Sequence, residues 1–160
     1  MKIVILSDSF KNTLTSVQVG KILKNELDKA FADVSYYAIA DGGEGTVDAL
    51  LLAKNAQKQE VEVVDAHLEK LKTYYAIDDE KNAYMDVASV VGFSANANHE
   101  LDVMNATTFG IGLMIKDAIV KGIKKIYLGL GGSITSDCGC GIACALGRKF
   151  YNKSGSSLIP

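Results

Sequence analysis

Short apolar runs that end in polar, glycine-containing turns recur along the chain. Lys2 to Leu6 is a β-branched run that stops at Ser7-Asp8-Ser9, and Val34 to Ala40 is a second run that stops at Asp41-Gly42-Gly43. Each run predicts a buried strand, because strands covered on both faces are continuously hydrophobic. Open α/β sheets bind their ligands at the carboxyl ends of such strands. The pattern therefore points to the two turns as candidate sites.

Helical spacing follows each of these turns. Thr15 and Gln18 form a Thr-x-x-Gln capping box, after which apolar residues recur every three or four positions. This spacing predicts a helix from about Thr15 to Phe31. Val47 to Lys54 predicts a second helix directly after the second turn. The order strand, polar loop, helix therefore occurs twice in the first third of the chain.

The middle third of the chain has the pattern of a meander. Glu60 to Val64, Lys72 to Ile77 and Ala83 to Val87 are strand-like and are separated by charged turns. Asp79 to Asn82 is the predicted hairpin turn. We therefore expect a mixed or antiparallel β segment here.

A third strand, loop and helix follow. Asn105 or Thr107 is expected to cap a helix, after which Lys124 to Leu130 predicts a strand. That strand opens into Gly131 to Asp137, and a short helix then stops near Gly147. The predicted fold class is α/β: a Rossmann-like, mostly parallel sheet with helices on its faces, plus the β segment in the middle.

Charge and composition narrow the range of ligands. The 160 residues carry a formal net charge of -2, and the lysines are scattered, which excludes a basic footprint for nucleic acid or an anionic membrane surface. No apolar run approaches the ~20 residues of a membrane span. We therefore expect a cytoplasmic protein whose ligand is a small molecule.

Cysteine and histidine give no metal signature in the sequence. The three cysteines crowd into one short segment, which suits reduced thiols rather than a disulfide framework. His67 and His99 are isolated, and neither stands at a zinc-like spacing from another ligand. The sequence therefore predicts no zinc site.

The loop after the third strand is the strongest candidate for phosphate binding. Gly131, Gly132, Ser133 and Thr135 follow a strand directly, and glycines let backbone N–H groups approach a phosphate. The loop matches neither a Walker A motif nor the dinucleotide fingerprint. The alternative interpretation is a tight turn that lets a helix pack closely against the sheet.

Two other turns carry charged side chains. Asp41 and Glu44 could hold Mg²⁺ or orient a substrate hydroxyl, or they could belong to a solvated turn that caps the next helix. Asp8, Ser9 and Lys11 offer an acid, a hydroxyl and an ammonium group, and the alternative for Lys11 is an ordinary surface residue. Parallel neighbouring strands would bring their ends together, so we expect Asp8, Lys11, Asp41, Glu44 and the Gly131–Ser133 backbone to converge on one cleft.

These segments together resemble the glycerate kinase family of the glycerate 2-kinase type. The resemblance rests on four motifs in order, supported by weaker matches at Met85-Asp86-Val87-Ala88 and Ala145 to Phe150. The four are Asp8-Ser9-Phe10-Lys11, Ala40-Asp41-Gly42-Gly43-Glu44-Gly45-Thr46, Thr107-Thr108-Phe109-Gly110 and Gly131-Gly132-Ser133-Ile134-Thr135-Ser136-Asp137. Four ordered motifs are more specific than any single glycine loop.

The resemblance implies phosphoryl transfer from ATP, with Mg²⁺, to D-glycerate. Residues 1–160 would be the N-terminal portion of a two-domain kinase, with the segment at about 60–105 contributing to a second lobe. Family members are more than twice as long, so the portion alone is expected to be inactive. A homo-oligomer is possible, and the oligomeric state stays open. The implied site residues are Asp8, Lys11, Asp41 and Asp137 for catalysis, Gly131, Gly132, Ser133 and Thr135 for ATP, Ser9, Gly42, Gly43 and Glu44 for the substrate, and Asp41 and Glu44 for the metal.

The chain departs from the family pattern at several positions. After Gly-Gly-Ser the family usually continues Ala-Thr-Asn-Asp-Gly-Gly, whereas Ser136 here replaces the asparagine and Cys138 replaces a glycine. Asp86 stands where the family more often has glutamate. Two other functions are weighed against the kinase: a non-catalytic module that binds a small anion or serves assembly, and a sugar or nucleotide-sugar enzyme with a generic Rossmann-like sheet.

Overall fold

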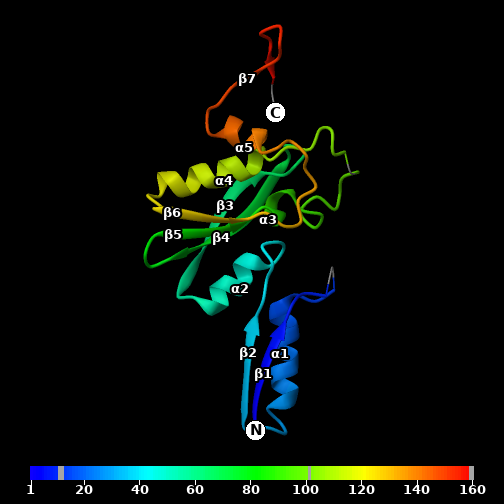
Figure 1. Cartoon of the computed structure of the whole chain (residues 1–160), viewed down its shortest axis with the longest axis vertical. Coiled ribbons are helices and arrows are strands. Elements are labelled where there is room, and N and C mark those ends of the chain that lie inside the picture. The colour runs from blue at the N-terminus through cyan, green and yellow to red at the C-terminus, as the bar shows by residue number, and fades with distance from the viewer. Residues whose placement is uncertain (11–12, 101, 159–160) are drawn as a thin grey trace.

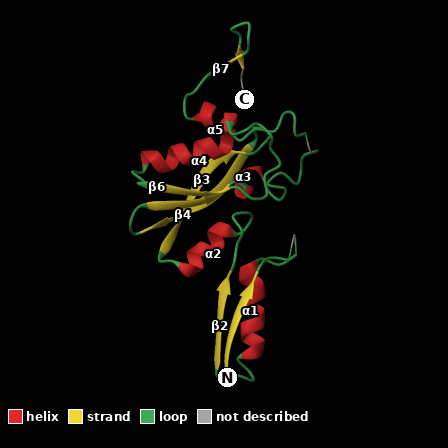
Figure 2. Ribbon diagram, in the orientation of Figure 1, coloured by secondary structure: helices red, strands yellow, loops and turns green. Residues whose placement is uncertain are grey.

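The computed structural model describes residues 1–10, 13–100 and 102–158, and it confirms the α/β fold class (Figures 1 and 2). The helices are α1 Ser16–Leu27, α2 Thr46–Ala53, α3 Ala88–Val91, α4 Phe109–Val120 and α5 Cys140–Ala145. The strands are β1 Lys2–Ser7, β2 Asp33–Ala38, β3 Ala56–Val64, β4 Lys70–Asp78, β5 Asn82–Asp86, β6 Lys125–Gly129, β7 Phe150–Tyr151 and β8 Ser157–Leu158.

The N-terminal unit is a parallel pair of strands with one helix against it. β1 and β2 pair in parallel, with Ser7 opposite Ala38. The predicted capping box begins α1: the Thr15 hydroxyl accepts from the Gln18 backbone N–H at 3.2 Å, and the Gln18 side chain accepts from the Thr15 backbone N–H at 2.8 Å. The carboxyl ends of β1 and β2 therefore lie side by side, as the sequence predicted.

A separate four-stranded sheet in the order β3-β4-β5-β6 forms the centre of the molecule. The first two pairings are antiparallel and the pairing of β5 with β6 is parallel. The predicted hairpin turn is confirmed, since β4 ends at Asp78 and β5 begins at Asn82. The Asp78 carboxylate accepts from both the backbone and side-chain N–H groups of Asn82 at 2.9 Å, which fixes this turn.

Alternating side chains of the central sheet face two different helices. The Tyr75 hydroxyl donates to Asp117 on α4 at 2.8 Å, and the Tyr74 hydroxyl donates to Asp48 on α2 at 2.7 Å. Successive strand residues point to opposite faces, so α4 and α2 cover opposite sides of the sheet (Figure 1). The main core lies on the α4 side and includes Val63, Tyr75, Met85, Val90, Ile111 and Met114.

The parallel strands are divided between two sheets. α2 contacts β2 as well as β3, β4 and β5, so it lies between the N-terminal pair and the central sheet (Figure 2). The central strands bury apolar residues on both faces, in the main core on the α4 side and against α2 on the other. The strand ends that carry the candidate site residues therefore come from two sheets rather than from neighbouring strands of one.

Several local boundaries differ from the sequence prediction. β3 begins at Ala56, four positions before the predicted start at Glu60, and the short elements α3, β7 and β8 were not predicted. The N-cap residue of α4 is Thr108, not Asn105 or Thr107. Among the helices of the described ranges, none has the length and apolar character needed to cross a membrane.

Candidate functional site

Two glycine loops cross in direct backbone contact. The Gly131 N–H donates to the Gly42 carbonyl oxygen at 2.9 Å, which ties the loop after β6 to the loop after β2. A Cβ atom at Gly129 would lie 2.4 Å from the Gly42 oxygen, and one at Gly131 would lie 2.9 Å from the Gly43 Cα atom. No side chain larger than hydrogen fits there without movement of the backbone. The predicted meeting of the Asp41–Glu44 turn with the Gly131–Ser133 loop is confirmed.

The turn before α2 is held by its own polar groups. The Asp41 carboxylate accepts from the Gly43 N–H at 3.0 Å, and the Thr46 hydroxyl donates to the Gly43 carbonyl at 2.7 Å. The Gly42 carbonyl and the Gly43 N–H, both in residues predicted to bind substrate, are thus engaged inside the protein. Glu44 is exposed, and its carboxylate accepts from the Ser94 hydroxyl at 3.1 Å.

A cavity of about 350 Å³ opens beside this turn. Its walls come from the start of α2, from β4 and from the segment after β5. The polar side chains that line it are Thr15, Glu44, Asp48, Lys72, Thr73, Tyr74, Asp86, Ser89 and Ser94. Three carboxylates and one ammonium group make the cavity acidic. An acidic wall favours a cation, or a substrate that brings a bound cation with it.

Asp86 is the buried acid of this cavity and was absent from the predicted site residues. The residue is 3% exposed, and its carboxylate accepts from the Ser89 N–H at 2.8 Å and from the Val47 N–H at 3.4 Å. Burial raises the pKa of Asp86, although the N–H donors of Ser89 and Val47 oppose the shift. A buried carboxyl with a raised pKa in a cavity marks a candidate functional residue. Its sequence signals were its place near the end of a predicted strand and the weaker family match at Met85-Asp86-Val87-Ala88.

The loop after β6 has the form of an anion cradle. Gly132 adopts a left-handed conformation with φ of 77°. Within the described part of the chain, the N–H groups of Gly132 and Ser133 donate no hydrogen bond, whereas those of Gly131 and Ile134 bind the Gly42 and Val91 carbonyls. The Ser133 and Thr135 hydroxyls lie 2.7 Å apart. Free consecutive N–H groups next to hydroxyls fit a phosphate.

Asp137 connects this loop to the starts of two helices. Its carboxylate accepts from the Thr108 N–H at 2.9 Å and hydroxyl at 2.8 Å, from the Gly141 N–H at 3.0 Å and from the Gly139 N–H at 3.1 Å. Partial burial by itself raises the pKa of the Asp137 carboxyl. The donors of Thr108, Gly141 and Gly139 outweigh that effect and hold the pKa below its ordinary value. This geometry gives Asp137 a positioning role in the loop.

The first predicted motif lies at the end of β1. The Asp8 carboxylate accepts from the Ser9 N–H at 2.7 Å, and both residues are exposed. The Ile39 N–H donates to the Ser7 carbonyl at 3.4 Å, so this end of β1 adjoins the start of the loop that carries Asp41. Lys11 lies outside the described residues, and its predicted role stays a prediction.

The acids of the site could bind Mg²⁺ only together with water and substrate oxygens. Among the described residues, neither Asp41 nor Glu44 belongs to a cluster of three protein ligands. Mg²⁺ usually keeps several waters and takes one or two carboxylates together with substrate phosphates. Glu44 and Asp86 on the cavity wall can supply such oxygens.

The chain spans less than half the length of the curated relatives that it matches. It is 37% identical to a glycerate kinase of Neisseria meningitidis serogroup B, over 99% of this chain and 43% of the relative. It is 33% identical to the glycerate 2-kinase of Escherichia coli K12, over 99% of this chain and 42% of the relative. It is 34% identical to a protein of Synechocystis, over 98% of this chain and 43% of the relative.

A solved structure shares the fold. The chain superposes with a TM-score of 0.78 and 30% identity on a crystal structure described as "putative glycerate kinase 2" from Salmonella typhimurium LT2. The match covers 98% of this chain and 43% of that one. A sequence profile of the glycerate kinase family matches residues 3–160. The crossing glycine loops and the acid-lined cavity thus lie within the matched region, and the chain belongs to the glycerate kinase family.

Proposed function

We propose that this chain forms part of an enzyme that transfers a phosphoryl group from ATP to D-glycerate. The observation that carries the proposal is the crossing of two glycine loops beside an acidic cavity, in a chain of the glycerate kinase family. Phosphoryl transfer depends mainly on positioning and on neutralisation of charge, and it needs little covalent work from the protein. Loops fixed backbone to backbone supply the positioning.

The proposed roles follow from the geometry. The Gly132 and Ser133 N–H groups and the Thr135 hydroxyl hold phosphate oxygens of ATP. Glu44, with Asp41 or Asp86, holds Mg²⁺, which when bound neutralises phosphate charge. Asp8 acts at the reacting groups from the end of β1, and the sequence resemblance assigns Lys11 to the same groups. Ser9, Gly42 and Gly43 line the place of the substrate.

The relation of Asp137 to catalysis is indirect in this proposal. Its carboxylate is saturated by donors from the two helix starts, so it orders the phosphate loop rather than accepting a proton. A direct catalytic role, as the sequence suggested, stays a prediction. The division into two lobes, with a second lobe that includes residues of about 60–105, likewise stays a prediction.

A chimera tests the kinase directly. Residues 3–160 of this chain replace the matching segment of the Neisseria meningitidis glycerate kinase, and a coupled assay measures ADP release that depends on D-glycerate. We expect turnover, and we expect Glu44→Gln or Asp86→Asn to lower kcat/KM by about a hundredfold. Asp33→Asn, at the exposed start of β2 and away from the cavity, serves as the matched control.

The alternative function is a module that binds a small anion without chemistry. Circular dichroism first establishes that the chimera is folded. A folded chimera that binds ATP or D-glycerate in calorimetry, yet releases no ADP, would favour the binding module and overturn the kinase proposal.

A further inference from the structure

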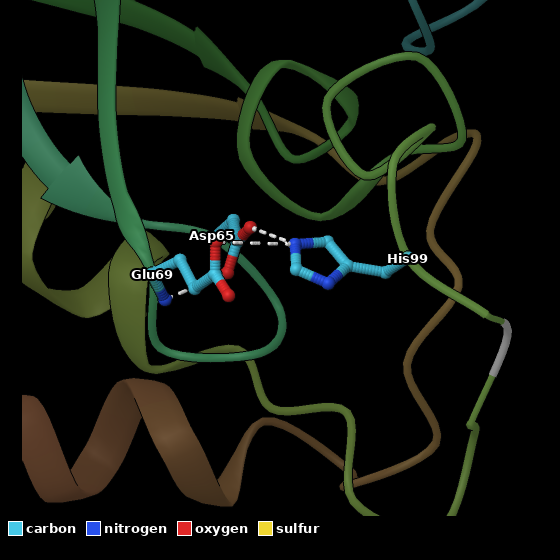
Figure 3. Close-up of side chains that lie close together, drawn as sticks. All are labelled: Asp65, Glu69 and His99. Atoms are coloured by element: carbon cyan, nitrogen blue, oxygen red, sulfur yellow. Dashed lines mark hydrogen bonds and ion pairs between the residues drawn. The ribbon is translucent and has the colours of Figure 1, made fainter.

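A second cluster of ionisable side chains lies outside the proposed kinase site. Asp65 follows β3, Glu69 precedes β4, and His99 comes from the segment between α3 and α4 (Figure 3). The His99 Nε2 atom lies 3.1 Å from an Asp65 carboxylate oxygen and 3.7 Å from a Glu69 carboxylate oxygen. One ligand atom from each of the three residues falls within 4.8 Å of the others. Three potential metal ligands therefore converge on one point.

Two of the three separations between these atoms are close to those of ligands around one small cation. Tetrahedral zinc binds nitrogen and oxygen at about 2.0–2.2 Å, which places neighbouring ligand atoms roughly 3.3 Å apart. The two separations from His99 lie on either side of that value. One imidazole and two carboxylates also form a ligand set that zinc and its neighbours in the transition series accept. Three protein ligands leave one position for water.

The Asp65 carboxylate is oriented by its own turn. Asp65 is 5% exposed, and its Oδ1 atom accepts from the His67 N–H at 2.8 Å and from the Glu69 N–H at 3.0 Å. The Oδ2 atom is left to face His99. Outer hydrogen bonds of this kind fix the direction of a metal-binding carboxylate.

The segment that carries His99 is anchored beside the same turn. Asn96 is 2% exposed, its side-chain oxygen accepts from the Ala66 N–H at 3.1 Å, and its carbonyl accepts from the His99 N–H at 3.0 Å. The position of His99 is therefore set by buried hydrogen bonds rather than by the cluster alone. A site ordered in advance binds an ion with less loss of conformational freedom.

A second histidine stands against the cluster. The His67 and His99 rings lie 4.4 Å apart between centroids. The His67 Nε2 atom is buried and has no hydrogen-bond partner among the described residues. A buried polar atom without a partner is unfavourable and calls for an explanation such as a missing ion or water. This atom lies next to the cluster because the His67 ring packs against the His99 ring.

We propose that Asp65, Glu69 and His99 bind a divalent transition-metal ion of the zinc class. The ion would join the turn between β3 and β4 to the segment between α3 and α4. The same segment carries Ser94, whose hydroxyl donates to Glu44 at 3.1 Å, so the ion would also brace one wall of the acidic cavity. The site does not depend on the proposed kinase activity.

Zinc titration of the purified chain tests the site. Free thiols also bind zinc, so the protein carries Cys138→Ser, Cys140→Ser and Cys144→Ser and is first stripped with a chelator. We expect calorimetry to show one Zn²⁺ per chain. Glu69→Gln and His99→Gln should each weaken binding by roughly 10–100-fold, as loss of even an outer partner does. Glu62→Gln, an exposed carboxylate on β3, should leave binding unchanged.

Two results would overturn the proposal. One is a folded, cysteine-free protein that binds no Zn²⁺. The other is Zn²⁺ binding that Glu69→Gln and His99→Gln leave unchanged, which would place the ion elsewhere. The Glu69 side chain is 71% exposed, so its substitution should not unfold the protein, and circular dichroism checks this. Co²⁺ in place of Zn²⁺ gives a spectroscopic readout, because its visible absorption reports a tetrahedral site.

Discussion

Single residues decide whether the two glycine loops can meet. Gly129 and Gly131 leave no room for a side chain against Gly42 and Gly43. Cys138 adopts a φ of 52°, a left-handed conformation that favours glycine, at the position where the family pattern has glycine. The loop after β6 is therefore specified by backbone contact as much as by its polar side chains.

Gly129→Ala should separate the loops. Its Cβ would lie 2.4 Å from the Gly42 oxygen, so we expect a loss of about 1–3 kcal/mol in the free energy of unfolding. Hydrogen exchange should rise in residues 41–46 and 131–137. Gly122→Ala, whose new Cβ meets no atom within 4 Å, is the control, and it should strain only its own turn. Unchanged exchange in both loops of Gly129→Ala would show that the crossing tolerates a side chain.

Asp86→Asn should change how stability depends on pH. The pKa of Asp86 is raised in the folded protein, so folding favours the protonated carboxyl. The wild-type protein should then lose stability as pH rises from the ordinary aspartate pKa through the raised one. The amide cannot ionise, so the stability of Asp86→Asn relative to wild type should increase over that interval. Urea unfolding at a series of pH values measures this change, with Asp33→Asn as the reference. A difference in stability between wild type and Asp86→Asn that does not vary with pH would contradict the prediction.

At the scale of elements, Asp137 links the starts of two helices to one loop. The N-cap residue of α4, Thr108, makes no side-chain hydrogen bond to its own helix. Its N–H and hydroxyl bind Asp137 instead, and the hydroxyl also accepts from the Ile142 N–H of α5 at 3.1 Å. α4, α5 and the phosphate loop are therefore expected to order together.

Asp137→Ala should loosen all three elements at once. Removing the carboxylate leaves the Thr108 and Gly141 N–H groups without their acceptor, which we expect to cost about 1–3 kcal/mol of stability. Thermal unfolding and hydrogen exchange in α4 and α5 measure the loss. An exchange increase confined to the loop would contradict the linkage.

The contribution of Asp137 to stability depends on pH with the opposite sign to that of Asp86. The pKa of Asp137 is lowered on folding, so its stabilisation is present above the ordinary aspartate pKa. The stabilisation should be lost as pH falls from that value through the lowered pKa. Wild type and Asp137→Ala should thus converge in stability on acidification, and urea unfolding at a series of pH values checks this.

At the scale of the whole molecule, one face of the N-terminal sheet is apolar and open. Val4, Leu6 and Tyr37 are 50%, 62% and 58% exposed, and Leu6 pairs with Tyr37 across β1 and β2. Paired residues and alternate residues share a face of a sheet, so the three side chains form one surface. α1 packs against this sheet, where Tyr36 approaches Gly20. An apolar surface of this kind favours association.

The purified chain should therefore self-associate through this face. Leu6→Gln should shift the population towards the monomer without lowering the melting temperature, because Leu6 is already exposed. Light scattering coupled to gel filtration measures the mass. Lys2→Gln, an exposed residue at the start of the same strand, is the control. A monomeric wild-type chain at high concentration would contradict the expectation.

The 160-residue chain alone should show little D-glycerate-dependent ADP release. Its one arginine, Arg148, lines a different hollow with Phe109 and Cys144, so no guanidinium clamp lies among the polar residues of the acidic cavity. Phosphoryl transfer also needs closure that excludes water. The coupled assay on the folded chain, with the chimera as the positive control, measures this. Comparable turnover from both proteins would show that these residues suffice.

The sequence by itself determined the elements and the turns, because these signals lie within a few residues of one another. The Thr15–Gln18 capping box and the turn between Asp78 and Asn82 are local and were predicted from the sequence. The meeting of the two glycine loops was also predicted, since both follow strands.

Only the tertiary structure decided which distant residues share a site. Asp86 faces the cavity because β5 pairs with β6 and α2 covers that sheet face, and the weak family match at Met85-Asp86-Val87-Ala88 did not predict its burial. His99 meets Asp65 across 34 positions of sequence, although each histidine looked isolated along the chain. The division of the parallel strands between two sheets likewise depends on α2 packing between them. Local spacing cannot encode such contacts, because they depend on the path of the whole chain.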